Sequence, residues 1–426
     1  MGKNESHRRK YRQQSHLESH ADAVITPVLE GNPLVPTNQA DWIDTEYDFL
    51  ALCDELLESG IFSYDTEFIG EDSYYAQTCL IQVATTKRVA LLDPFVVKDL
   101  APLYALIADP TITTILHSGS QDLEPVARLY GKPPAAIFDT QLAAGLVGYP
   151  WPISLTKLIE SVLHHDVGGH FTFSQWDARP LSDRQLFYAA DDVRYLIAIH
   201  NHLKSTLETL GRTQWAEEEC STFTTMDKYS FNLFNVVKRI CKNKNPRKKE
   251  MQRIQTVAAL RETIAIELNL PTRAVIPNEC VLALAKKPVE TVEQLASMKG
   301  FPRNMATRFG NKILQAILEA PSIEPMHLRK PQAIEKEAET RQELDGIWSL
   351  FGAWCVGKQL STGLVTNRPT FTDWFLALRE GNELSDSPLQ QGWRCEAVKE
   401  FADMISGNGT ISFSYNETLH AENVTP

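Results

Sequence analysis

The stretch FSYDTEF, residues 62–68, reads as a buried strand that nevertheless carries two carboxylates, Asp65 and Glu67. Side chains of a strand alternate between its two faces, so the aromatic residues take one face and both carboxylates take the other. Two like charges on one face of a strand cost free energy unless water or a cation offsets them. The stretch alone leaves two interpretations open, a solvated strand edge and a metal site.

A mixture of helical and strand patterns surrounds this stretch, from Trp42 to about His202. The segment DTEYDFLALCDELLESG has the apolar spacing of an amphipathic helix that ends at Gly60. Strand-like segments follow in the order FSYDTEF, CLIQVAT, RVALLD and TITTILHS. The short TTK connection between the second and third of these favours a hairpin. We therefore expect an α/β fold with a mixed sheet rather than a wholly parallel one.

The composition is that of a globular protein with two or three domains, because 43% of the 426 residues are hydrophobic. The net charge of −12 argues against binding nucleic acid through overall charge, although local basic patches can still do so. Seven scattered cysteines without a C-x-x-C pair suggest neither a disulfide framework nor a zinc site, and they fit a reducing cytoplasm. No apolar run is long enough to span a membrane.

Changes in composition divide the chain. The expected divisions are a polar tail (1–40), an α/β domain (41–215), a connector with a basic run (216–244), a helical domain (245–322), a charged linker (323–343), a second mainly helical domain (344–416) and a tail (417–426). The basic run contains no acidic residue and continues into the first helical domain. Its members are Lys238, Arg239, Lys242, Lys244, Arg247, Lys248 and Lys249, which we expect to contact phosphates.

Further carboxylates occur at two places in the α/β region. Asp122 lies in LHSGSQDLEPVARLYG, where it follows a predicted strand and begins an apolar helical pattern. It is either a ligand brought beside FSYDTEF or an ordinary acid at a helix N-terminus. In QLFYAADDVRYLIAIH, Tyr188 and Asp192 are four residues apart and share one helix face.

Four carboxylates and a phenol in this order suit hydrolysis of a phosphodiester. Two divalent ions held by oxygen ligands can clamp the attacking water and the leaving 3' oxygen. Such hard cations prefer carboxylates to thiols or imidazoles. The phenol of Tyr188 would orient the attacking water or help to deprotonate it.

Six segments together resemble the ribonuclease D family, which belongs to the tyrosine-bearing branch of the DEDD 3'-to-5' exonucleases. They are YDTEF, TCLIQVA, LHSGSQDLE, FDTQLAA, SQWDARPLS and LFYAADDVRYL. The resemblance implies a ribonuclease-H-like (DnaQ-like) fold. It also places Asp65, Glu67, Asp122 and Asp192 on the family's metal-binding carboxylates and Tyr188 on its third-motif tyrosine. It further implies two Mg²⁺ or Mn²⁺ ions, release of nucleoside 5'-monophosphates, structured RNA such as tRNA precursors as substrate, and a monomer.

Residues 245–322 resemble the helicase-and-RNase-D C-terminal (HRDC) domain, and the last unit, with GWRCEAVKEFADMISG, resembles the second such domain of bacterial members; a plain helical appendage is the alternative. The chain departs from the family in DVGGHFTFSQW, where Gly168 and Gly169 stand in place of the usual Lys and Arg. This puts contacts to the phosphate or the 3' end in question. Two rival functions stay open, a DNA exonuclease and a non-catalytic RNA-binding protein.

Overall fold

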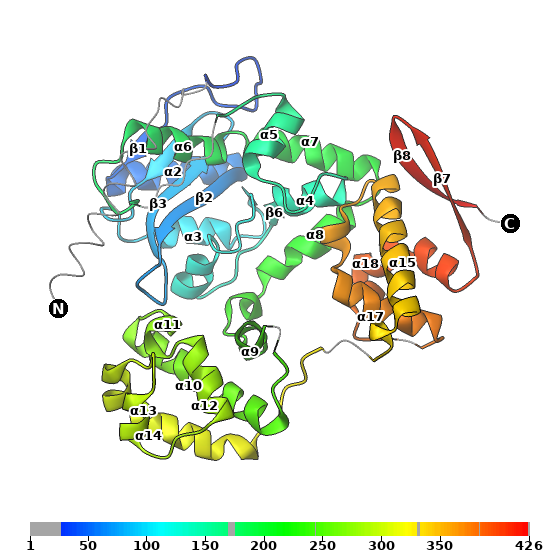
Figure 1. Ribbon diagram of the computed structural model, residues 1–426. Helices are drawn as coiled ribbons and strands as arrows, with labels where there is room; N and C mark the ends of the chain where they lie inside the picture. Colours follow the sequence, from blue (N-terminus) through cyan, green and yellow to red (C-terminus); the bar gives the residue numbers. More distant parts are fainter. Residues whose placement is uncertain (1–26, 169–174, 243, 330–332, 383, 425–426) are drawn as a thin grey trace. The chain divides into compact units, whose positions relative to one another are not determined.

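The computed structural model describes residues 27–168, 175–242, 244–329, 333–382 and 384–424 (Figure 1). The chain forms two compact units. Unit 1 comprises residues 1–67, 80–225 and 348–426, and unit 2 comprises residues 68–79 and 226–347. Among the described residues, no helix is long and apolar enough to cross a membrane.

A six-stranded sheet forms the centre of the α/β region, with the strand order β1-β4-β3-β2-β5-β6 (Figure 1). The strands are β1 Asp41–Ile43, β2 Ile61–Ile69, β3 Gln77–Ala84, β4 Val89–Leu92, β5 Thr113–Leu116 and β6 Ile137–Asp139. β3 and β4 pair antiparallel through the short turn at Thr85, whereas β2 pairs parallel with β5, and β5 with β6. The predicted hairpin and mixed sheet are confirmed.

Helices flank this sheet in unit 1. They are α2 Glu46–Ser59, α3 Ala101–Ile107, α4 Thr140–Leu146, α5 Leu155–Leu163, α6 Asp183–Arg194, α7 Leu196–Thr209 and α8 Thr213–Ser221, with a π-helix η1 at Val126–Tyr130 and a 3-10 turn η2 at Thr222–Thr224. α2 begins at Thr45, whose side chain accepts from the Asp48 N–H. It ends at Gly60, which adopts the left-handed conformation with φ +64°. The predicted end of this helix is confirmed.

The segment before β1 is more ordered than the polar tail expected over residues 1–40. Val35 is buried. The guanidinium of Arg194 donates to the carbonyl oxygens of Pro36, at 2.5 Å, and Asn38, at 3.0 Å. At least residues 34–38 therefore pack against unit 1, whereas residues 1–26 lie outside the described part of the chain.

The C-terminal region of unit 1 is a helical layer closed by a hairpin. Its elements are α15 Ala338–Gly357, which begins in unit 2, then α16 Thr362–Val365, α17 Arg368–Arg379, η6 Pro388–Gln390, α18 Gly392–Ile405, β7 Thr410–Asn416 and β8 Thr418–Val424. Phe351, Trp354, Phe371 and Phe401 stack together in its core. The two strands pair antiparallel along their whole length. β8 thus occupies most of the stretch that the sequence leaves as a C-terminal tail.

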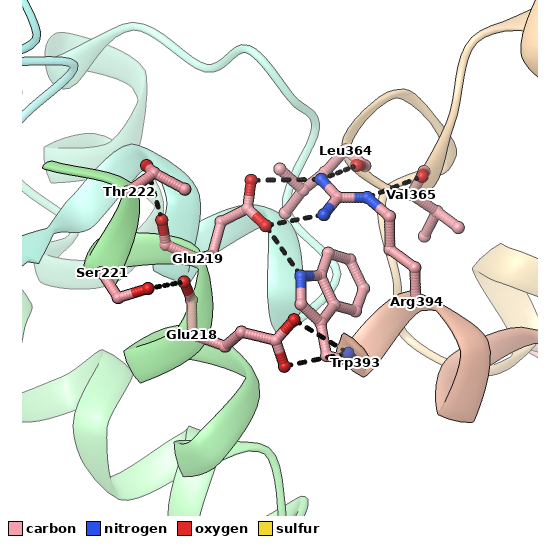
Figure 2. Close-up of polar contacts among 8 residues, drawn as sticks. All are labelled: Glu218, Glu219, Ser221, Thr222, Leu364, Val365, Trp393 and Arg394. Carbon is pink, nitrogen blue, oxygen red and sulfur yellow. Dashed lines mark hydrogen bonds and ion pairs between the residues drawn. The ribbon is translucent and has the colours of Figure 1, made fainter. Parts of the chain in front are cut away.

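Two neighbouring glutamates on α8 attach this region to the α/β region (Figure 2). Glu218 accepts from the backbone N–H of Trp393 at the start of α18. Glu219 accepts from the Trp393 indole at 2.7 Å and from both terminal nitrogens of Arg394, at 2.8 and 3.1 Å. Helices α8 and α18 are therefore joined by charge-assisted hydrogen bonds.

Unit 2 is helical. It contains η3 Met226–Tyr229, α9 Leu233–Cys241, α10 Lys248–Leu268, α11 Thr272–Val275, α12 Asn278–Lys286, α13 Val292–Ser297, α14 Arg303–Glu319, η4 Ala320–Ser322 and η5 Ala333–Lys336. Apolar residues from α9 to α14 form one core, against which Tyr74 from the segment 68–79 also packs. The Tyr74 hydroxyl donates to Glu262, and Asn269 accepts from the Tyr74 N–H. The predicted helical domain thus includes a segment from far upstream in the chain.

Candidate active site

The two carboxylates of β2 lie on the face of that strand that is turned toward α6. Ser63, which shares their parity on the strand, donates its hydroxyl to the Val193 carbonyl of α6 at 2.8 Å. Because side chains on a strand repeat every second residue, Asp65 and Glu67 project from the same face as Ser63. Both are half-buried. The solvated strand edge, one of the two interpretations of this stretch, does not describe this position.

Asp122 is held in place by the other face of β2. It lies in the turn between β5 and η1, so it precedes the helical segment rather than opening a regular α-helix. Its side chain is 7% exposed. Thr66 donates its hydroxyl to Asp122 Oδ1 at 2.5 Å, and Tyr64 donates to the Asp122 carbonyl at 3.3 Å. Thr66, between the two carboxylates of β2, and Tyr64, directly before them, therefore position the third.

The fourth carboxylate and the phenol come from α6. This helix begins with a capping box in which Ser182 and Gln185 bond reciprocally. Tyr188 and Asp192 follow one turn apart, as the sequence predicts. The ring of Trp176 lies 6.2 Å from the ring of Tyr188 and is almost fully buried.

The charges of these side chains raise one another's pKa values, as those of neighbouring carboxylates do. Burial raises the pKa of Asp65 well above its usual value, and the charges of Asp122, Asp192 and Glu67 raise it further. Burial, followed by the charge of Asp122, raises the pKa of Glu67 to about 8. The charge of Asp192, then burial and the charge of Glu67, raise the pKa of Tyr188. Burial together with the charge of Glu67 also raises the pKa of Asp192.

The donor chemistry of this cluster fits hard divalent cations. All four acids are carboxylates, and their mutual repulsion is the kind that a bound cation relieves. Across the described residues, no three His, Cys, Asp or Glu side chains are already arranged as a metal site. The hydroxyl of Thr66 donates to Asp122 Oδ1 and so fixes the orientation of this carboxylate, whose two oxygens offer more than one acceptor site. Asp65, Glu67, Asp122 and Asp192 are the residues that would hold such ions.

Two polar side chains in these segments are given no role by the sequence. Thr66 falls within FSYDTEF, but its role depends on a partner 56 positions away. His117 directly follows β5, and its ring is flanked by the Thr140 hydroxyl at 2.9 Å and the Ile153 carbonyl at 3.0 Å. Burial lowers the pKa of His117 to about 4. The histidine in LHSGSQD stands directly before the turn that holds Asp122, and this position was the sequence feature from which a structural role for His117 could have been predicted.

The loop in which the chain departs from the family lies mostly outside the described residues, which exclude residues 169–174. Gly168 is described, and its N–H donates to the Asp166 carboxylate at 2.8 Å. After this gap, Arg179 forms a bidentate ion pair with Asp93, at 2.7 and 2.9 Å. This ion pair within unit 1 therefore holds the side chain of Arg179 in place.

The predicted basic run lies in unit 2, whereas the carboxylate cluster lies in unit 1. The run begins on α9, continues through the following turn and ends in the first turn of α10. All seven of its side chains are exposed: Lys238, Arg239, Lys242, Lys244, Arg247, Lys248 and Lys249.

Two family models and several known proteins are similar to this chain. The model of a family described as 3'-5' exonuclease matches residues 40–208, and that of the HRDC domain matches residues 250–317. A ribonuclease D of Bartonella henselae is 32% identical over 84% of this chain and 87% of its own length. One of Desulfotalea psychrophila is 31% identical over 85% of this chain and 97% of its own length.

The chain belongs to the ribonuclease D family. The crystal structure of Escherichia coli RNase D, described as an exoribonuclease involved in structured RNA processing, is also similar. It has a TM-score of 0.68 and 25% sequence identity, and the match covers 86% of this chain and 98% of that one. The DnaQ-like exonuclease fold with a mixed sheet and a following HRDC domain is thereby confirmed for this member of the ribonuclease D family.

Proposed function

We propose that this chain shortens RNA from its 3' end in a metal-dependent reaction that releases nucleoside 5'-monophosphates. The exoribonuclease class follows from membership of the ribonuclease D family. The observation that carries the mechanism is the coupled cluster of four carboxylates and one phenol, drawn from β2, the turn after β5 and α6.

Each residue of the cluster has a separate task in this proposal. Asp65, Glu67, Asp122 and Asp192 would hold two divalent ions, either Mg²⁺ or Mn²⁺. When bound, such ions supply charge stabilisation for the attacking water and the leaving oxygen. In the absence of metal ions the charge of Asp192, then burial and the charge of Glu67, raise the pKa of Tyr188. In the proposed reaction its hydroxyl would orient the attacking water by hydrogen bonding or help to deprotonate it.

Structured RNA with a free 3' end, such as a tRNA precursor, is the proposed substrate. The exposed basic run of unit 2 supports this, since phosphate contacts in nucleic-acid complexes come largely from Lys and Arg. The region 245–322 holds twelve Lys and Arg against seven Asp and Glu, although the whole chain is acidic. The C-terminal region over 344–416 is proposed as a second HRDC-like domain. Seven free cysteines support a reducing cytoplasm, and we infer a monomer.

The test follows a 5'-labelled tRNA precursor with extra 3' nucleotides, incubated with Mg²⁺ or with a chelator. Stepwise 3' shortening by wild-type protein with Mg²⁺, absent for Asp65→Asn, is the expected result. Near-normal turnover by Asp65→Asn would rule this metal site out. A matched DNA strand separates an exoribonuclease from a DNA exonuclease. Bound RNA without any shortening would instead favour the non-catalytic RNA-binding protein.

A further inference from the structure

Helix α9 has one face that completes the core of unit 2 and another that faces water. Val236, Val237 and Ile240 are buried in that core. The helix begins at Asn232, whose side chain accepts from the Asn235 N–H at 3.0 Å. This cap fixes which residues point outward, because the buried positions occupy one side of a helix with 3.6 residues per turn.

Two phenylalanines lie on the outward side. Phe231, directly before the cap, and Phe234, in the first turn, are each 42% exposed. Exposing two large aromatic side chains so close together gives up the free energy of burying them. Neighbouring exposed apolar residues of this kind are a feature of interaction sites.

The same side of α9 continues as a line of positive charge. Lys238 follows Phe234 by four residues within α9, so these two side chains lie along one face. Lys242, which directly follows the helix at its C-cap, is also exposed. Arg239 follows Lys238 on the same helix and is also exposed. Three basic side chains, Lys238, Arg239 and Lys242, are therefore exposed along α9 and at its C-terminal end.

We propose that the exposed surface of α9 and of the residues that flank it, formed by Phe231, Phe234, Lys238 and Lys242, binds single-stranded RNA. Bases stack on the two phenyl rings while the two lysines contact the phosphates. This inference rests on the proposed function, which makes RNA the ligand. The α9 face lies before residues 250–317, so it is distinct from the segment that matches the HRDC family.

The chemistry of this face suits an enzyme that trims different RNA ends. Every base has a flat face, so stacking on an aromatic ring tolerates any sequence. The lysines hold the backbone, which is also the same for every sequence. An apolar segment of a partner protein could use the rings, but it would have no use for the row of lysines unless it were acidic.

The experiment compares Phe231→Ser/Phe234→Ser with Lys238→Gln/Lys242→Gln, both in an Asp65→Asn background that prevents cleavage. The ligand is an oligoriboadenylate about 12 nucleotides long, and the dissociation constant is measured by fluorescence anisotropy at several salt concentrations. Tyr47→Ser, which removes an aromatic ring that is 82% exposed on α2, is the matched control. Circular dichroism and thermal melting establish that each variant is folded.

The two variants should fail in different ways. The phenylalanine variant should bind about 10-fold or more weakly at every salt concentration, since stacking on one base is worth about 1–3 kcal/mol and releases no counterions. The lysine variant should show a salt slope that is smaller by about 1.4, or roughly 0.7 for each lost phosphate contact. An abasic strand of the same length should remove the difference between wild-type and phenylalanine variant. Tyr47→Ser should bind as wild type does.

Two further outcomes separate this inference from the proposed function. Suppose that protein with intact carboxylates trims RNA. If the phenylalanine substitutions then leave the affinity unchanged in the Asp65→Asn background and leave KM unchanged in the protein with intact carboxylates, the α9 inference is wrong and the proposed function stands. The inference also fails if the variant loses equal affinity for the abasic strand, because stacking is then not involved. If protein with intact carboxylates trims no RNA, the proposed function itself fails, whatever the affinities are.

Discussion

Replacing Glu67 with Gln should stabilise the protein in the absence of metal, although the same change should impair hydrolysis. In the metal-free protein, burial and the charge of Asp122 raise the pKa of Glu67 to about 8, from an ordinary value of 4.5. The unfolded chain loses this proton at a lower pH than the folded chain does. Rising pH between about 4.5 and 8 therefore favours unfolding, and a neutral Gln removes this dependence.

The size of the effect follows from the width of that pH window. One pH unit is worth about 1.4 kcal/mol, so at pH 7.5 the cost to the folded state is at most about 4 kcal/mol. Glu67 is half-buried, and water screens part of this cost, which leaves about 2 kcal/mol. For a unit of this size, we expect Glu67→Gln to raise the melting temperature by roughly 4–8 °C.

The assay is thermal melting of both proteins in chelator at pH 5 and pH 7.5, and again with Mg²⁺. The advantage of the variant should be small at pH 5 and large at pH 7.5. Added Mg²⁺ should stabilise wild type more than the variant, because binding to the folded state alone raises stability. Glu58→Gln, which changes an exposed acid on α2, is the control. An equal or lower melting temperature for Glu67→Gln at pH 7.5 in chelator would refute the reasoning, as would an advantage that does not depend on pH.

Three other predictions follow from single contacts. Thr66→Val should lower kcat by about 10- to 100-fold, because it removes a hydrogen bond to the charged Asp122, whereas Thr66→Ser should keep most of the activity. Equal kcat values for the two variants would contradict the role assigned to the Thr66 hydroxyl. Arg394→Ala should lower the melting temperature by roughly 4–8 °C, because it removes the bidentate partner of Glu219. A change below about 1 °C would show that this pair contributes little. Burial lowers the pKa of His117 to about 4, so the free energy of unfolding should fall by up to about 3 kcal/mol as the pH drops from about 6.5 to 4. His117→Gln should remove that part of the pH dependence. An unchanged pH dependence in this variant would contradict the assignment to His117.

Local features of the sequence predict much of the fold, because local chemistry determines them. Gly60 ends α2, since glycine adopts the left-handed conformation without a steric penalty. The short connection at Thr85 leaves β3 and β4 no alternative to a hairpin. Tyr188 and Asp192 share a helix face through their spacing alone.

Features that depend on distant partners could not be predicted in the same way. The bond between Thr66 and Asp122 joins two segments whose approach is set by the whole sheet. The stretch from Ile411 to Tyr415 alternates between apolar and polar residues, as a strand does. However, the helical patterns before it in the sequence do not predict that a hairpin follows. Tyr74 belongs to the α/β segment in sequence and packs into the helical core of unit 2 in space.

The strand β2 shows why two carboxylates stand where the pattern of a buried strand would place apolar residues. Four acids that repel one another need rigid support, since otherwise their side chains would turn outward to water. β2 supplies this support from both faces: Ser63 bonds the strand to α6, and Thr66 and Tyr64 bond it to the turn that carries Asp122. The hydroxyl groups of Ser63, Tyr64 and Thr66 thus hold the carboxylates in place. A protein with the four carboxylates but an apolar residue at position 66 should bind metal more weakly, so Thr66→Val tests the support of the site, whereas Asp65→Asn tests its charge.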